Sequence, residues 1–141
     1  MDTQATLDYI NNKMLPNTLM QTLSIKVTEI GDNLVVAKMP VTPAVHQPDG
    51  ILHGGASVAL AESVGSIATH LFVDTEKYFV RGLEISANHL KSVKDGFVTA
   101  TAKPIHQGRT TQIWEIKITD DVDNLISLCK LTAIILPKTT S

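Results

Sequence analysis

The sequence predicts an α+β fold in which one curved antiparallel β-sheet wraps around a single long helix. Between residues 54 and 70, apolar residues recur every three or four positions, which is the spacing of a helix. Before and after this segment lie runs rich in β-branched residues, separated by short turn sequences that are typical of antiparallel strands. Because the predicted helix is built largely from Gly, Ala and Ser, surrounding backbone can approach it closely, and the economical packing places it inside the sheet.

The overall composition bounds the class of protein. A chain of 141 residues with 43% hydrophobic and 18% charged residues is long enough to bury one core, so we expect a single domain over residues 1–141. No apolar run approaches the roughly 18 residues that a membrane-spanning helix needs. The first fourteen residues lack a basic region followed by a long apolar block, so we expect a cytoplasmic protein without a secretory signal.

The charge and the single cysteine exclude further classes. The net charge is −2 and the basic residues are scattered, which argues against a nucleic-acid partner. Cys129 is the only cysteine, so neither an internal disulfide nor a multi-cysteine metal site can form. It lies in the apolar run of residues 125–136, and we interpret it as a core residue rather than a nucleophile.

Each element has its own local signal. Asp2 or Thr3 can cap a first helix, a lead-in over about residues 1–15 that should stop before Pro16. Two β-prone runs flank the turn sequence Gly-Asp-Asn and predict a hairpin, and a proline-containing loop follows at residues 40–52. After the long helix, four further strands are expected to form an antiparallel meander. The predicted strands cover residues 23–30, 34–41, 78–90, 96–106, 110–120 and 125–136.

The segment HQPDGILHGGASVALAESVGS, residues 46–66, carries the residues that suggest chemistry. A helix that begins at Gly54 and Gly55 offers unpaired N–H groups and the positive end of its dipole, and glycine lets a ligand oxygen approach those donors. This is suited to an oxyanion or a polarised carbonyl. The alternative is that the two glycines only make a tight entry into the helix.

Glu62 is the one acidic residue within the predicted helix. Small apolar residues surround it, and an ionised carboxylate is costly there unless it is paired or used, so we expect Glu62 not to be exposed. Ser66, one turn further on, can hydrogen-bond the carboxylate or a bound water. The alternative is a solvated glutamate on the outer face of the helix.

Helix geometry separates the two candidate groups. Nine residues at about 100° each place Glu62 roughly 180° around the helix from His53 and about 13 Å further along it. The two cannot serve one site within one chain. If both act on one substrate atom, the carboxylate comes from a second copy related by a two-fold axis, so the sequence predicts a dimer.

The same segment resembles the hotdog-fold acyl-coenzyme A thioesterases of the PaaI-like branch. That branch includes the Glu-type 4-hydroxybenzoyl-CoA thioesterases, the proofreading thioesterases of enterobactin synthesis and the 1,4-dihydroxy-2-naphthoyl-CoA thioesterases. The stretches GLEISANHLKSV and HQGRTTQIWEIKITDD are also similar to it, so the resemblance covers nearly the whole chain. It implies a hotdog fold and hydrolysis of an aromatic or medium-size acyl-CoA, such as a hydroxybenzoyl or dihydroxynaphthoyl thioester.

The resemblance also implies roles for individual residues. The thioester carbonyl would lie on the N–H of Gly54 or Gly55, and Glu62 of the partner subunit would attack it or deprotonate a water. Coenzyme A is part of the substrate, so no separate cofactor is expected. A dimer is required and a tetramer is expected, and an acyl-carrier protein is left open as the carrier of the thiol. The remaining catalytic and acyl-binding positions would be Gln47, His53, Ser66 and His89.

Coenzyme A needs a groove and a few cationic contacts. Arg109 is the best candidate for a phosphate contact, followed by His106 and Lys91, although an arginine in a turn can also be merely solvated. The resemblance implies that Gly82 admits the pantetheine arm. One departure is Asp49, where close relatives usually carry an apolar or aromatic residue, so the shape or charge at one edge of the acyl pocket is expected to differ.

Several other activities are disfavoured or left open. A serine esterase needs a G-x-S-x-G elbow, which the sequence lacks. The histidines have no metal-site spacing, so we expect no catalytic metal. A hotdog enoyl-CoA hydratase or dehydratase, and a non-catalytic acyl-CoA-binding dimer, remain as alternatives.

Overall fold

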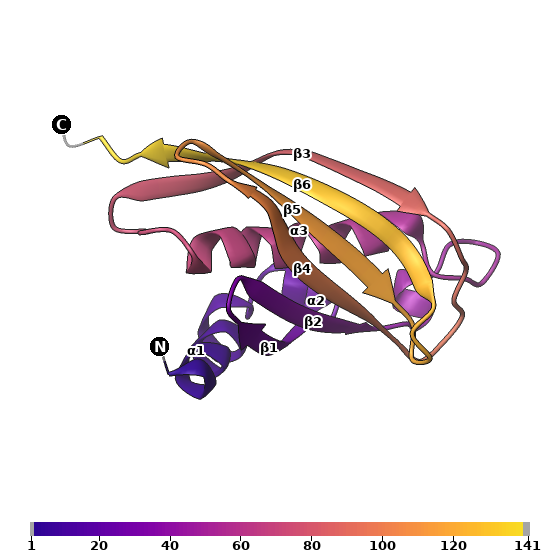
Figure 1. Cartoon of the computed structure of the whole chain (residues 1–141). Coiled ribbons are helices and arrows are strands. Elements are labelled where there is room, and N and C mark those ends of the chain that lie inside the picture. The colour runs from indigo at the N-terminus through magenta and orange to yellow at the C-terminus, as the bar shows by residue number, and fades with distance from the viewer. Residues whose placement is uncertain (1, 140–141) are drawn as a thin grey trace.

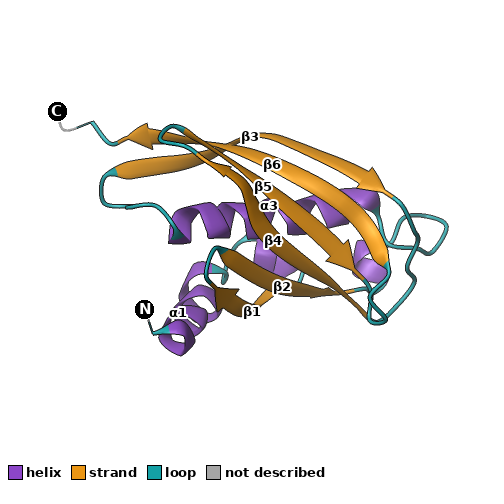
Figure 2. Ribbon diagram, in the orientation of Figure 1, coloured by secondary structure: helices purple, strands orange, loops and turns teal. Residues whose placement is uncertain are grey.

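The computed structural model describes residues 2–139, and it contains one six-stranded antiparallel sheet curved around one long helix (Figures 1 and 2). Helix α3 spans Gly54–Leu71 and lies along the inner face of the sheet. The order of strands across the sheet is β1-β2-β4-β5-β6-β3. This confirms the predicted α+β architecture. The strands are β1 (Lys26–Gly31), β2 (Leu34–Pro40), β3 (Tyr78–His89), β4 (Phe97–Gln107), β5 (Thr111–Thr119) and β6 (Leu125–Pro137).

The predicted meander is correct for only three of its four strands. Strands β4, β5 and β6 are neighbours in chain order, but β3 pairs with β6, and β4 pairs with β2. The segment after β3 crosses the end of the sheet, where Leu90 N–H donates to Ile126 O at 2.8 Å and Val93 O accepts from Leu52 N–H at 2.8 Å. Turn sequences report where the chain reverses. They do not show which distant strand the chain pairs with next, so the order of strands across the sheet could not be predicted from local sequence.

The N-terminal lead-in is fastened to the sheet. Asp2 caps α1 (Thr3–Tyr9) through its side chain, and the chain continues as one π-helical turn, η1 (Ile10–Met14), before Pro16, as predicted. The amide of Asn11 bonds both backbone groups of Val27 in β1, at 2.8 and 2.9 Å.

The start of the predicted hairpin is later than the sequence indicated. A short helix, α2 (Leu19–Thr22), and a residue with positive φ, Ser24, precede β1, so the strand begins at Lys26 rather than at residue 23. The loop that follows β2 contains the 3₁₀ turn η2 (Pro43–Val45).

The core lies between α3 and the inner face of the sheet. The helix buries the apolar positions that gave its periodicity, Leu60, Val64, Ile67 and Ala68. At the C-terminal end of α3, the fully buried ring of Trp114 stacks on a phenylalanine that follows the helix, with 6.0 Å between the ring centroids. A fully buried large apolar side chain contributes roughly 1.5–3 kcal/mol, so this interface accounts for much of the stability.

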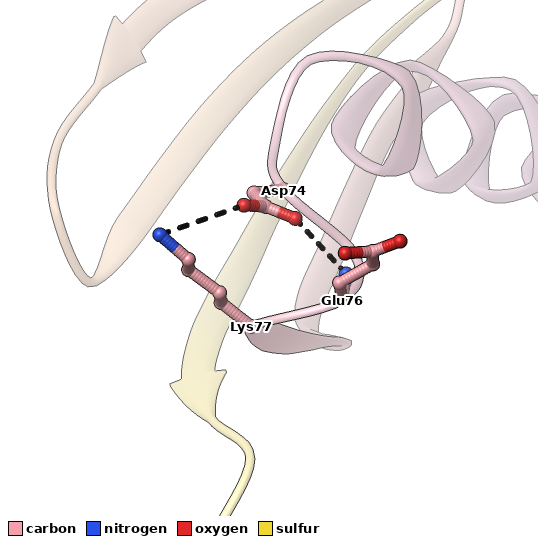
Figure 3. A network of polar contacts seen from close by, with 3 residues as sticks. All are labelled: Asp74, Glu76 and Lys77. Atoms are coloured by element: carbon pink, nitrogen blue, oxygen red, sulfur yellow. Dashed lines mark hydrogen bonds and ion pairs between the residues drawn. The ribbon is translucent and has the colours of Figure 1, made fainter.

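The turn from α3 into β3 is held by Asp74 (Figure 3). Its carboxylate accepts the N–H of Glu76 at 3.1 Å, and its backbone carbonyl accepts the N–H groups of Lys77 and Tyr78. The ion pair with Lys77, at 4.0 Å, joins two well-exposed side chains, and such pairs contribute little. The backbone hydrogen bonds therefore define this turn.

The helix approaches the sheet most closely at Gly65. A Cβ at this position would lie 2.6 Å from Cδ2 of Leu131, a fully buried side chain of β6. We predict that Gly65→Val destabilises the fold by about 1–3 kcal/mol through overpacking, measured as a lower urea midpoint. Trimming the opposing side chain in the double variant Gly65→Val/Leu131→Ala should cost less than the sum of the two single changes. If the free-energy changes of the two single variants simply add, Leu131 is not the side chain that limits the space at position 65.

Candidate active site

The N-terminal end of α3 presents one open backbone donor. His53 is the N-cap, and its Nδ1 accepts the N–H of Gly55 at 2.7 Å. The carbonyl of His53 accepts the N–H groups of Ala56 and Ser57. No described residue accepts the N–H of Gly54. Of the two glycines considered from the sequence, Gly54 therefore keeps its N–H available to a ligand, whereas that of Gly55 is already bonded.

The loop before α3 is held in place by the segment before β4. His46 Nε2 lies 2.8 Å from Lys94 O, and the N–H of His53 donates to Val45 O at 2.8 Å. A tight turn at Gly50, with φ of +79°, closes the loop, and Asp49 is exposed within it. Asp49 is not among the residues that line the adjoining pocket.

A pocket of about 310 Å³ adjoins the open N–H group. Four of the predicted site residues line it, namely Gln47, Gly54, His89 and Lys91. Most of the other lining side chains are apolar, among them Ile51, Leu52 and Ile126. The structure thus brings together residues from the loop, the helix and the end of β3, and it provides an apolar space beside them.

His89 faces the helix terminus. Its Nδ1 lies 2.7 Å from the hydroxyl oxygen of Ser127, its partner across the β3–β6 ladder. On the other edge of the ring, a Cβ at position 54 would lie only 2.7 Å from Nε2. Position 54 must be glycine for the imidazole to occupy this place, which gives Gly54 a packing role in addition to its open N–H.

Two buried serines in this pocket were not identified from the sequence. Ser57 and Ser127 are 2% and 0% exposed, and both line the pocket. Ser57 could have been found, because it lies three residues after Gly54 and so on the same face of the helix. Ser127 could not, because its position opposite His89 depends on the register between two strands 38 residues apart.

Glu62 does not lie in this pocket. Its carboxylate lies beside β3, where a Cβ at Gly82 would be 3.1 Å from Oε2. Along α3, Glu62 follows Gly54 by eight residues, or about 12 Å at 1.5 Å per residue. The two halves of the predicted site are therefore far apart within one chain.

The prediction that Glu62 is not exposed is wrong for the single chain. Glu62 is exposed, because it lies on the side of α3 that faces the edge strand β3, beyond which the sheet has no further strand. Small neighbours in the sequence do not bury a side chain when no element covers that face.

Two other predicted catalytic residues lie apart from the pocket. The ring of His53 folds back over Gly55, and with His46 it borders a separate hollow of about 290 Å³ near α2. Ser66 is half-buried, and no hydrogen bond joins its hydroxyl to Glu62 among the described residues.

The candidates for a phosphate contact lie at opposite ends of the sheet. Lys91 lies where β6 begins, and Arg109 lies in the β4–β5 turn, which contacts the far end of β6. About nine strand residues separate these ends, or roughly 30 Å. His106 lies near Arg109, because a Cβ at the neighbouring Gly108 would be 2.7 Å from Nε2 of His106. One chain cannot place Lys91 and Arg109 on the same phosphate.

Two features are absent from the described residues, 2–139. No group of three or more His, Cys, Asp or Glu residues is arranged to hold a metal ion there. No helix in that range has both the length and the apolar character needed to cross a membrane.

Comparison with known proteins identifies the family. Residues 49–127 match the family model described as the Thioesterase superfamily, and this range includes the whole of α3 and most of the pocket. The chain belongs to the thioesterase superfamily. The hotdog fold and the thioester hydrolase activity predicted from the resemblance are confirmed.

Individual thioesterases are similar over most of their length. A solved glutamine-to-alanine mutant of a thioesterase from Pseudomonas aeruginosa superposes with a TM-score of 0.91 at 42% identity, covering 94% of each chain. A 1,4-dihydroxy-2-naphthoyl-CoA hydrolase of Escherichia coli K12 is 44% identical over 89% of this chain and 91% of its own. The proofreading thioesterase EntH of Cronobacter turicensis is 46% identical over 82% and 83%, respectively.

Cys129 of this thioesterase is a core residue, as predicted. It is 2% exposed, and burial raises the pKa of its thiol to about 11. The thiolate is the reactive form of cysteine, so this residue is not a nucleophile at neutral pH.

The raised pKa of Cys129 predicts a pH dependence of stability. Below about pH 9 the thiol is protonated in both states. Between pH 9 and 11 the unfolded chain loses this proton first, so the contribution of Cys129 to the free energy of unfolding falls by about 2 kcal/mol. In urea titrations, the difference in the free energy of unfolding between the wild type and Cys129→Ala should therefore be smaller at pH 11 than at pH 8. A constant difference between them would contradict the raised pKa.

Proposed function

We propose that this protein hydrolyses acyl-coenzyme A thioesters with an aromatic or medium-size acyl group, at sites shared between two subunits. The observation that carries the proposal is the division of the site. The pocket at Gly54 has donors and apolar walls but no carboxylate, and Glu62 lies eight residues further along α3, about 12 Å away, beside Gly82 of β3. Relatives named as a dihydroxynaphthoyl-CoA hydrolase and a proofreading thioesterase support the choice of substrate. They favour hydrolysis over the hydratase and the non-catalytic binder.

The open N–H of Gly54 polarises the thioester carbonyl in this proposal. It combines a free donor with the positive end of an 18-residue helix, and both stabilise the negative charge that develops on the oxygen. Gln47 lines the same pocket, and in this proposal its amide donates to the same carbonyl. Losing one such donor typically raises the barrier by about 3 kcal/mol.

A second copy of the chain supplies the carboxylate. Strand β3 is twelve residues long and pairs on one side only, with β6. A long unpaired edge strand readily pairs with another chain. If two β3 edges pair antiparallel about a two-fold axis near Ile85, Gly82 of one subunit lies opposite His89 of the other. Glu62, beside Gly82, is then carried to the partner's pocket.

Exposed apolar side chains support this pairing. Phe79 and Leu83 in β3, and Leu90 just after it, are 44%, 58% and 59% exposed in the single chain. Apolar side chains at the edge of a sheet are typical of an interface between subunits. The exposure of Glu62 has the same explanation, because the side of α3 next to β3 is where the second subunit would lie. The association of two such dimers into a tetramer remains a prediction.

In this arrangement, Glu62 acts on the carbonyl carbon held at Gly54 of the other subunit. Two routes use the same geometry. The carboxylate attacks the carbonyl, expels the thiolate and forms an anhydride that water cleaves, or it removes a proton from a water that attacks directly. In both routes the products are the carboxylic acid and free coenzyme A. Ser66, one turn from Glu62, holds the water, and His53 orients the glycine turn through its bond to Gly55.

Subunit complementation tests the shared site. Alone, Glu62→Gln lacks the acid, and Gly54→Ala displaces His89, so each should lose activity by about 100-fold or more. In a mixed dimer of the two variants, one of the two sites combines the intact Glu62 of one chain with the intact Gly54 of the other. Random mixing makes half of the dimers mixed, so co-expression should restore about a quarter of wild-type thiol release.

Two controls accompany this experiment. Co-expression of two differently tagged Glu62→Gln chains should restore nothing, and tandem purification through both tags should confirm that mixed dimers form. If purified mixed dimers are as inactive as their parents, both halves of the site belong to one chain, and the shared site is wrong.

The phosphate contacts are tested with a truncated substrate. In the proposed dimer, Lys91 of one subunit and Arg109 of the other lie at the same end of the joined sheet and can both contact coenzyme A. Lys91→Ala and Arg109→Ala should each raise KM for an acyl-CoA about 10-fold or more, because each removes a charge-assisted hydrogen bond. Neither should change KM for the matching pantetheine thioester, which has no nucleotide phosphates. An equal rise with both substrates would place these residues outside the nucleotide site. Hydrolysis of the pantetheine thioester of an acyl-carrier protein would show that the carrier protein can replace coenzyme A as the carrier of the acyl group.

A further inference from the structure

Ser127 is the only described residue whose side chain bonds the imidazole of His89. It lies opposite His89 in the β3–β6 ladder, is 0% exposed, and has its hydroxyl oxygen 2.7 Å from Nδ1. The other ring nitrogen, Nε2, has no partner among the described residues and faces Gly54 at the pocket. Whether Nδ1 donates to Ser127 or accepts from it decides whether Nε2 of the neutral ring is an acceptor or a donor toward the pocket.

The need of the buried Ser127 hydroxyl for an acceptor favours one direction. If Nδ1 carried a proton and donated it to Ser127, the serine hydroxyl would need another acceptor, and none is present among the described residues. A buried hydroxyl whose proton has no acceptor is costly. The hydroxyl therefore donates to Nδ1, and the proton of the neutral ring is on Nε2.

We propose that Ser127 is a positioning residue that holds His89 as the Nε2–H tautomer, so that His89 is a second hydrogen-bond donor to the thioester oxygen beside the N–H of Gly54. This inference rests on the proposed function. The resemblance placed His89 only among the catalytic and acyl-binding positions. The orientation of the ring assigns it to the carbonyl oxygen instead, and a ring that presents N–H to the pocket cannot act there as a general base.

The placement of His89 fits this role. Its Nε2 edge is against Gly54, whose N–H is the open donor at the helix terminus, so two donors from two elements converge on one region.

Nitrogen-15 NMR of the substrate-free protein tests the tautomer directly. With labelled histidine at about pH 8, above the ordinary imidazole pKa of about 6.5, each ring reports which nitrogen carries the proton. The spectrum contains internal references. His53 accepts at Nδ1 and must be Nε2–H, whereas Nδ1 of His70 lies 2.9 Å from the carbonyl of Ser66 and must carry a proton. His89→Gln identifies the resonances of His89 by their disappearance.

We expect His89 to match His53 in the wild type. In Ser127→Ala we expect a mixture of tautomers, and in Ser127→Thr, which keeps the hydroxyl, the wild-type pattern. A His89 signal matching that of His70 in the wild type would overturn the inference and leave the proposed function intact. That measurement uses the unmodified protein, so misfolding of a variant cannot obscure it.

Kinetics test the consequence for catalysis. Ser127→Ala should lower kcat about 10-fold with little change in KM, because the donor acts mainly in the transition state. His89→Ala should lower kcat about 100-fold, and His89→Gln, whose amide can donate near the position of Nε2, should recover part of that loss. Thr28→Ala, which removes an exposed hydroxyl from β1 at the opposite edge of the sheet, is the control and should match the wild type.

The kinetic outcomes separate the two proposals. If His89→Gln is as inactive as His89→Ala while Glu62→Gln is also inactive, the donor role of His89 is wrong and the shared site stands. If Glu62→Gln retains full activity, the proposed mechanism fails, whatever the tautomer of His89.

Discussion

The contact between the first residue of α3 and the imidazole of His89 is the constraint on which the site depends. Gly54 has no side chain, so the ring can lie against the helix terminus, and a Cβ there would come within 2.7 Å of Nε2. The glycine has two consequences that no other residue could combine. It leaves its own N–H open to the pocket, and it admits a side chain from the far end of β3 beside that N–H. The helix dipole and the histidine thereby act at one point.

The rest of the fold serves to hold that contact in place. The loop before α3 is bonded to the segment that enters β4, and the end of β3 is bonded to the start of β6, so both sides of the pocket are anchored to the sheet. Along the helix, small residues allow the sheet to come close, most tightly at Gly65 against Leu131. A site built on a buried helix and paired strands is held with little freedom, which is what stabilisation of a developing charge requires.

The edge of the sheet explains why one chain is insufficient. The strand order leaves β3 with one neighbour, and Glu62 lies on the helix beside that edge, exposed and without a partner side chain among the described residues. Gly82 makes room for its carboxylate against the strand. The proposed pairing of two β3 edges would cover the exposed side chains of this edge and join each acid to the other subunit's donors. One interface would then serve both assembly and chemistry.

Local patterns in the sequence specify the longer elements and the identity of the chemical groups. The helix predicted over residues 54–70, the capped lead-in and most of the β-strand residues follow from local periodicity and turn residues, and Gly54 and Glu62 follow from their types at the start and middle of that helix. Tertiary structure decided everything that depends on distant pairing. It placed β3 beside β6 rather than β4, Ser127 opposite His89, and Glu62 on an uncovered face rather than a buried one. The physical reason is that periodicity records which face of an element is apolar, whereas the partner of that face is chosen by packing among segments far apart in the chain.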